Sequence, residues 1–172
     1  MLLRPMNASD LDELLVVQEE GAVLGLSEVF PQDSYPFPRE SIRERWAEEL
    51  LDPAIVCWVA ISAAGGDAGS VVGGNRGIRA GQPAGFAATR GNELLHFGTA
   101  VWSWGSGLAS ELHDAVIDGL RADWPAARLH VFEGNARARR FYAKHGWVPT
   151  GSSTRSAFAP HPVLLGYRLD LE

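Results

Sequence analysis

The spacing of apolar residues predicts a mixed order of strands and helices along this chain. Apolar side chains recur at helical spacing in four segments, at residues 11–15, 42–50, 108–120 and 138–142. Short apolar or alternating runs predict strands at residues 2–4, 55–61, 85–89, 94–101, 129–132, 147–150 and 163–171. Because strands and helices interleave, the pattern indicates an α/β protein, in the broad sense that includes α+β arrangements.

Capping residues mark the ends of several of these helices. Ser9 or Asp10 is expected to cap the first helix, and Asp52 before a proline is expected to end the second. Asn135 is a good N-cap for the last helix, and Gly146 suits the position just past its end. The aromatic pair in this last helix is predicted to turn inward.

At 172 residues the chain is long enough for one sizeable core and too short for two typical domains. The sequence therefore predicts a single domain over residues 1–172. We expect three parts: an N-terminal part (1–83), a core (84–150) and a C-terminal strand region (151–172). The N-terminal part would contain a substrate loop (25–38) and a flexible connection rich in Gly, Ala and Ser (62–83), with a possible short strand at 70–72.

Composition narrows the functional classes. Hydrophobic residues make up 46% and charged residues 21%, which is typical of a folded protein. The lack of a long apolar run or a signal-peptide pattern predicts a cytoplasmic protein without a membrane partner. A net charge of −6 disfavours nucleic acid as a partner. The single cysteine, Cys57, is expected to be a small buried hydrophobe, and no cluster with metal-ligand spacing occurs, so no metal is expected.

A glycine-rich turn precedes the third predicted helix and is the first candidate for chemistry. Gly105 and Gly107 let a phosphate approach the backbone, and the helix start offers free N–H groups. Taken alone, the turn also fits a plain loop before a core helix. A Walker loop is excluded because no lysine follows. A dinucleotide fingerprint would place Ser110 at its third small position and Glu133 on a ribose, but too little chain follows the turn for a doubly wound fold.

Two motifs in the same order carry a family resemblance. The turn reads Trp104-Gly105-Ser106-Gly107-Leu108-Ala109, and Asn135, Ala138, Phe141, Tyr142, Gly146 and Trp147 follow a short strand. In these residues the chain resembles the GNAT superfamily of N-acetyltransferases. Its coenzyme motif is Arg/Gln-x-x-Gly-x-Gly/Ala and its later motif is Asn-x-x-Ala-x-x-Phe-Tyr-x-x-x-Gly-Phe/Trp. The match is firm over residues 84–150.

The resemblance implies a fold and a coenzyme site. The fold would be a mixed central sheet of six to seven strands, flanked by about four helices, with two splayed parallel strands in the middle. Acetyl-CoA would bind as co-substrate between residues 94–101 and 129–132. Trp104 departs from the family pattern, so backbone amides would carry the pyrophosphate. The implied coenzyme-binding residues are Phe97, Gly98, Thr99, Trp104, Gly105, Ser106, Gly107, Leu108, Ala109, Ser110 and Asn135.

The implied reaction is direct attack of an amine on the acetyl thioester, which needs an acid and a base. Tyr142 occupies the family's usual acid position, although a core tyrosine would also fit there. Glu93 matches the catalytic glutamate of the histone-acetyltransferase branch, and His130 stands where ribosomal-protein N-terminal acetyltransferases carry a glutamate. His96 is a third candidate for the base. Two alternatives remain open, namely that Glu93 is only a solvated charge and that His130 is a structural histidine.

The sequence therefore predicts an N-acetyltransferase acting on a primary amine of a small molecule or peptide, as a homodimer if it follows the family. A non-catalytic acyl-CoA-binding regulatory domain of the same fold is the first alternative, and a dinucleotide-binding protein is the second. The acceptor is expected to be selected by residues 25–38 and by the poorly periodic segment 152–162.

Overall fold

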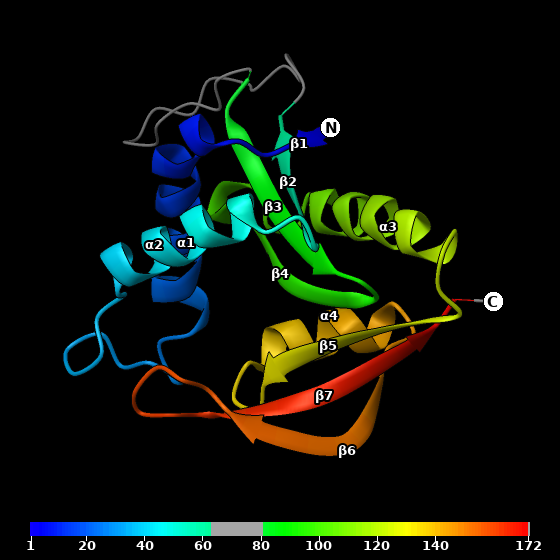
Figure 1. Cartoon of the computed structure of the whole chain (residues 1–172). Coiled ribbons are helices and arrows are strands. Elements are labelled where there is room, and N and C mark those ends of the chain that lie inside the picture. The colour runs from blue at the N-terminus through cyan, green and yellow to red at the C-terminus, as the bar shows by residue number, and fades with distance from the viewer. Residues whose placement is uncertain (63–80, 172) are drawn as a thin grey trace.

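A seven-stranded sheet lies between two pairs of helices in the computed structural model, which describes residues 1–62 and 81–171 (Figure 1). The strand order is β1-β2-β3-β4-β5-β7-β6. Only β4 and β5 run parallel among neighbouring strands of this sheet. The strands are β1 (Leu2–Pro5), β2 (Ile55–Ile61), β3 (Pro83–Arg90), β4 (Glu93–Thr99), β5 (Ala126–Phe132), β6 (Val148–Arg155) and β7 (Val163–Asp170). The predicted mixed sheet with a central parallel pair is confirmed.

Each pair of helices covers one face of the sheet (Figure 1). The helices are α1 (Leu11–Gly25), α2 (Arg39–Leu51), α3 (Leu108–Arg121) and α4 (Ala136–Lys144), and short 3₁₀ turns occupy η1 (Ala8–Asp10) and η2 (Val101–Ser103). On one face, α1 and α2 pack over β2 and β3, with Leu14 and Trp46 in the middle of that core. On the other face, α3 and α4 pack over β4, β5 and β7, with Leu112 and Tyr142 inside.

Alternation along the strands divides the two cores. Cys57 and Val59 of β2 face the α1–α2 side, while Ala60 faces the α3–α4 side. In β5, Leu129 and Val131 are buried against α3, and the residue between them points to the opposite face. Cys57 is a buried free thiol, as its place in an apolar run predicts.

The start of the first helix differs from the prediction. Asp10 stands at the N-cap position of α1, as predicted, but its side chain makes no capping bond there. The capping bond comes from Asn7, whose side chain accepts from the Ser9 N–H at the start of the preceding 3₁₀ turn. The Asp10 carboxylate instead accepts from the Asn7 N–H and pairs with Arg4 at 2.6 Å. An additional turn ahead of α1 therefore moved the capping bond.

The C-terminal region also differs. β6 continues to Arg155, so the first part of segment 152–162 belongs to a strand and not to a substrate loop. Every residue of β6 is exposed, and a strand with no buried side has no alternating pattern to reveal it. The possible strand at 70–72 lies outside the described residues. Within the described part of the chain, no helix is long and apolar enough to cross a bilayer.

Candidate functional site

The parallel strands β4 and β5 pair at one end and separate at the other (Figure 1). Their register holds only Glu93 opposite Arg128 and Leu94 opposite Leu129. Beyond these pairs, residues 96–99 of β4 pair only with β3, and residues 130–132 of β5 pair only with β7 within the described sheet. We call these two facing stretches the β4–β5 fork. Its free N–H and C=O groups are suited to an extended, amide-bearing ligand that adds like a strand.

The predicted coenzyme segment Phe97-Gly98-Thr99 forms the β4 side of this fork. On its other edge it pairs with β3, where Gly98 lies opposite Phe86. The Thr99 carbonyl accepts from the indole N–H of Trp104 at 3.2 Å, which fastens the glycine turn to the end of β4. The turn and the fork are therefore one continuous structure.

The loop between α1 and α2, residues 26–38, meets the far end of β5. Phe30 packs edge-to-face on Phe132, with ring centroids 5.3 Å apart, and Val29 is buried. Since β5 ends at Phe132, the loop closes over the β5 arm of the fork. This position beside the fork is consistent with the predicted role of the loop in acceptor choice, which stays a prediction.

The glycine turn has the open shape that anion binding requires. Gly105 has a φ of +83° and Gly107 a φ of +93°, a region that favours glycine. A β-carbon at either position would meet no atom within 4 Å, so both glycines border open space. Leu108 N–H donates to Ser106 Oγ at 3.3 Å, whereas the N–H groups of Ala109 and Ser110 bond to no described residue. Free helix N–H groups beside open space are suited to binding an anion.

Arg137 stands over the residue that departs from the family pattern. Its guanidinium carbon lies 3.4 Å from the ring centroid of Trp104. Burial, and secondarily the charge of Arg140, lowers the pKa of Arg137. The turn thus has a cationic neighbour that comes from α4 and not from the motif itself.

The last helix follows its predicted design. The Asn135 side chain accepts from the Ala138 N–H at 3.0 Å and so caps α4, and Gly146 follows the helix with a φ of +84°. Tyr142 is 8% exposed, and its ring centroid lies 6.4 Å from that of Phe97 on the fork. Burial raises the pKa of Tyr142 well above its ordinary value. Its hydroxyl makes no hydrogen bond with a described residue.

Comparison with known proteins agrees with this geometry. The sequence model of the acetyltransferase (GNAT) family matches residues 23–147. The chain belongs to the acetyltransferase (GNAT) family. Among solved structures, it is similar to spermidine N-acetyltransferase from Vibrio cholerae in complex with CoA and spermine, with 15% identity over 99% of this chain and 95% of that one, and a TM-score of 0.67. It is also similar to ribosomal-protein-S18-alanine N-acetyltransferase from Escherichia coli, with 15% identity, 99% and 94% coverage and a TM-score of 0.64. No curated protein matches the sequence.

The two predicted bases of this GNAT chain lie together. Glu93 Oε1 is 3.2 Å from His130 Nδ1, at the closed end of the fork and on the face opposite α3. The side chains are 28% and 44% exposed, respectively. They were predicted as alternatives, and the parallel pairing of their strands makes them one pair.

The third predicted base, His96, has a partner that sequence reasoning missed. Its Nε2 lies 2.7 Å from Oε2 of Glu49, on α2. Glu49 follows Ile42 and Trp46 at inward helical spacing, and all three are buried. A carboxylate at an inward position needs a buried partner, so its spacing in the sequence could have pointed to such a pair. No comparable pattern in the sequence pointed to Arg137, the other residue that was missed.

The structure also collects one group with metal-ligand atoms, although none was expected. Ligand atoms of His113, Asp114 and His145 lie within 4.8 Å of one another. However, Trp147 donates its indole N–H to His113 Nε2 at 3.0 Å, so a neutral His113 carries its hydrogen on Nδ1 and donates it to Asp114 at 2.8 Å. That nitrogen has no lone pair for a metal while both bonds hold. A hydrogen-bonded cluster explains these residues.

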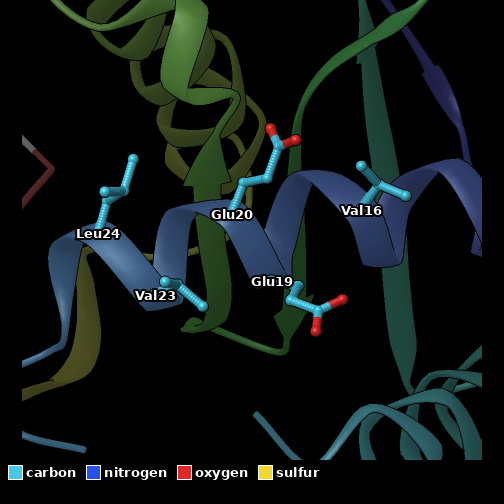
Figure 2. A pocket seen from close by; sticks show the side chains of 5 residues that line it. All are labelled: Val16, Glu19, Glu20, Val23 and Leu24. Atoms are coloured by element: carbon cyan, nitrogen blue, oxygen red, sulfur yellow. The ribbon is translucent and has the colours of Figure 1, made fainter. Parts of the chain in front are cut away.

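A shallow hollow on the outer side of α1 lies apart from these groups. It is lined by Val16, Glu19, Glu20, Val23 and Leu24, and Figure 2 shows Glu20 and Leu24 extending to one side of the helix. None of these residues belongs to the fork or to the glycine turn.

Proposed function

We propose that this chain is an N-acetyltransferase that moves the acetyl group of acetyl-CoA directly to a primary amine. The observation that carries the proposal is the continuity of the β4–β5 fork with an open glycine turn. The fork has unpaired backbone groups for the pantetheine amides, and the turn has free N–H groups for the pyrophosphate. The two sites are joined at Thr99 and Trp104.

Acetyl-CoA supplies the activated thioester, and the chain's own groups hold and orient it. Backbone groups of Phe97, Gly98 and Thr99 are proposed to bind the pantetheine arm, and a backbone N–H there would polarise the thioester carbonyl. Residues 104–110 would hold the pyrophosphate, with the Arg137 guanidinium beside them. Asn135 fixes the start of α4 by its capping bond, which keeps Tyr142 against Phe97.

Tyr142 is the proposed acid for the departing thiolate. Its ring is buried beside the fork, and its hydroxyl bonds to no described residue and is reached by solvent, so it remains free to donate. We propose that the amine loses its proton on the face opposite α4. Glu93, His130 and His96 are the candidates there.

The acceptor is proposed to be an amine on a small molecule or a peptide. The structural neighbours are named for spermidine and for a ribosomal-protein alanine, and both acceptors are amines. A net charge of −6 suits a cationic acceptor. The loop at residues 26–38 borders the fork and is the proposed selector.

Thermal melts and thiol release test the proposal. Acetyl-CoA and CoA should raise the melting temperature, while NAD should not. Release of CoA thiol is then measured with a panel of spermidine, spermine and an alanine-terminated peptide. Stabilisation by CoA without transfer to any amine would favour the non-catalytic acyl-CoA-binding alternative, and stabilisation by NAD alone would favour the dinucleotide-binding one. Light scattering on the same samples tests the predicted homodimer.

Two matched tyrosine substitutions test the acid. Tyr142→Phe keeps the packing, so melting and coenzyme binding should persist while turnover falls about a hundredfold. Tyr167→Phe is the control, because Tyr167 is also buried but its hydroxyl accepts from Arg139 Nε at 3.3 Å. Unchanged turnover in a stable Tyr142→Phe protein would identify Tyr142 as a packing residue.

A further inference from the structure

The Glu49 carboxylate is a buried charge with a partner on each oxygen. It is 9% exposed, with Oε2 2.7 Å from His96 Nε2 and Oε1 3.1 Å from Arg45 Nε. Burial acts to raise the pKa of Glu49, but the bonds to His96 and Arg45 outweigh it, and the pKa is lowered overall. Glu49 is therefore ionised at neutral pH.

An ionised carboxylate fixes the tautomer of the histidine beside it. Because Glu49 can only accept, His96 Nε2 must carry the hydrogen, and a neutral ring has its lone pair on Nδ1. Nδ1 bonds to no described residue. No fully buried side-chain nitrogen or oxygen of the described chain lacks a partner, so solvent reaches Nδ1. His96 thus has a free, accessible proton acceptor and a carboxylate behind it.

A β-bulge aims His96 at α2. In the register with β3, Ala88 lies opposite His96 and Thr89 opposite Leu94, so Leu95 is the extra residue. His96 contacts Trp46 of α2 at 4.7 Å between ring centroids, whereas the next residue, Phe97, stacks on Phe141 of α4. His96 and Tyr142 therefore flank the same part of the fork from opposite faces.

We propose that His96, oriented by Glu49, takes the proton from the acceptor amine. This assignment rests on the proposed acetyltransferase function. The rival pair, Glu93 and His130, is longer at 3.2 Å and more exposed, and it lies where β4 and β5 are still paired. An exposed pair of this kind orients a ring weakly. His96 instead lies beside the residue against which Tyr142 packs.

The two proton transfers are then separated by the sheet. The ammonium group gives a proton to His96 Nδ1, its nitrogen attacks the thioester carbonyl carbon, and the C–N bond forms. The C–S bond breaks as the nitrogen gives its second proton to solvent, and the thiolate takes a proton from Tyr142. Solvent returns one proton to Tyr142 and His96 gives its proton to solvent, so one proton is released per turnover. Glu49 is a positioning residue, which stabilises the protonated ring and holds the tautomer.

Few titratable groups surround this pair. Arg45 pairs with Glu49, and burial, with the charge of Glu49, raises the pKa of the Cys57 thiol to about 11, so the thiol is neutral. The acid limb of the rate profile should therefore report the His96–Glu49 pair alone.

Turnover is measured against pH, with the amine from the panel that reacts fastest. His96→Gln should lower kcat about a hundredfold at neutral pH, leave the KM for acetyl-CoA unchanged and remove the acid limb. Glu49→Gln should lower kcat about tenfold and move the acid limb to lower pH, because the neutral amide no longer stabilises the protonated ring. Glu48→Gln is the matched control on the exposed side of α2 and should behave as wild type. An acid limb that is lost in His130→Gln and kept in His96→Gln would overturn the proposal.

A second measurement needs no acceptor and no variant. Nitrogen-15 NMR of the imidazoles in the whole wild-type protein, at a pH where the His96 ring carries one proton, should find that hydrogen on Nε2 and a bare Nδ1. Hydrogen on Nδ1 would refute the assignment even if the protein is an acetyltransferase. Failure of every amine in the panel would instead refute the proposed function, while the tautomer still decides whether His96 is built to accept a proton.

Discussion

Gly98 lies on the fork, and its substitution tests how tightly β4 is packed. A β-carbon at this position would lie 2.4 Å from Cζ and 2.8 Å from Cε1 of Phe86, the residue opposite it in the register. The ring cannot swing away freely, because Phe86 is 6% exposed and packs edge-to-face on Trp46 at 5.8 Å. Gly98→Ala must therefore displace the ring or β4 itself.

The expected cost follows from two opposing effects. Overpacking a filled core costs about 1–3 kcal/mol. Replacing glycine by alanine recovers about 0.4–1 kcal/mol, since the unfolded chain has fewer conformations. Gly98→Ala should thus lower the free energy of unfolding by about 1–2 kcal/mol. In the Phe86→Leu background the clash is absent, so the two substitutions should couple by about 1 kcal/mol or more.

Urea unfolding of the four proteins in this cycle measures that coupling, with the slope m checked for two-state behaviour. Gly119→Ala, within α3, is the matched control, because a β-carbon there meets no atom within 4 Å. It should stabilise the protein by up to about 1 kcal/mol. If Gly98→Ala is as stable as wild type with an unchanged m, Phe86 does not cover Gly98 and the packing described for β4 is wrong.

Three further predictions concern the turn, the histidine cluster and the last helix. Gly107→Val should abolish the melting shift caused by acetyl-CoA, because a side chain would occupy the open space and resist a φ of +93°; a full shift in the folded variant would exclude this anion site. Burial lowers the pKa of His113 and outweighs the opposing hydrogen bond to Asp114, and the charge of His145 adds a smaller lowering. Below about pH 6.5 the histidine of the unfolded chain binds a proton that the folded His113 ring does not, so the free energy of unfolding should fall by up to about 1.4 kcal/mol per pH unit. Urea unfolding at pH 7 and 5 should show this fall, and a smaller fall in His113→Gln. Asn135→Ala should cost about 1 kcal/mol in the same assay through loss of the α4 cap, and an unchanged stability would contradict the capping bond.

Features encoded by neighbouring residues were predictable from the sequence. The α4 cap depends on a bond between Asn135 and Ala138, and the glycine turn depends on conformations that glycine favours. The β2 strand occupies the predicted residues 55–61, because the whole run is apolar and five of its seven residues are buried. The β6 strand escaped detection beyond its start because both of its faces are exposed.

Features that depend on distant residues required the tertiary structure. The parallel pairing of β4 with β5 joins Glu93 to His130, which are 37 residues apart, and the packing of α2 on the sheet joins Glu49 to His96, which are 47 apart. The sequence determined which acidic, basic and histidine side chains are present, and its local spacing and capping residues carry the family resemblance. It did not determine which carboxylate meets which imidazole, because the strand register, the bulge at Leu95 and the packing of α2 set those contacts together.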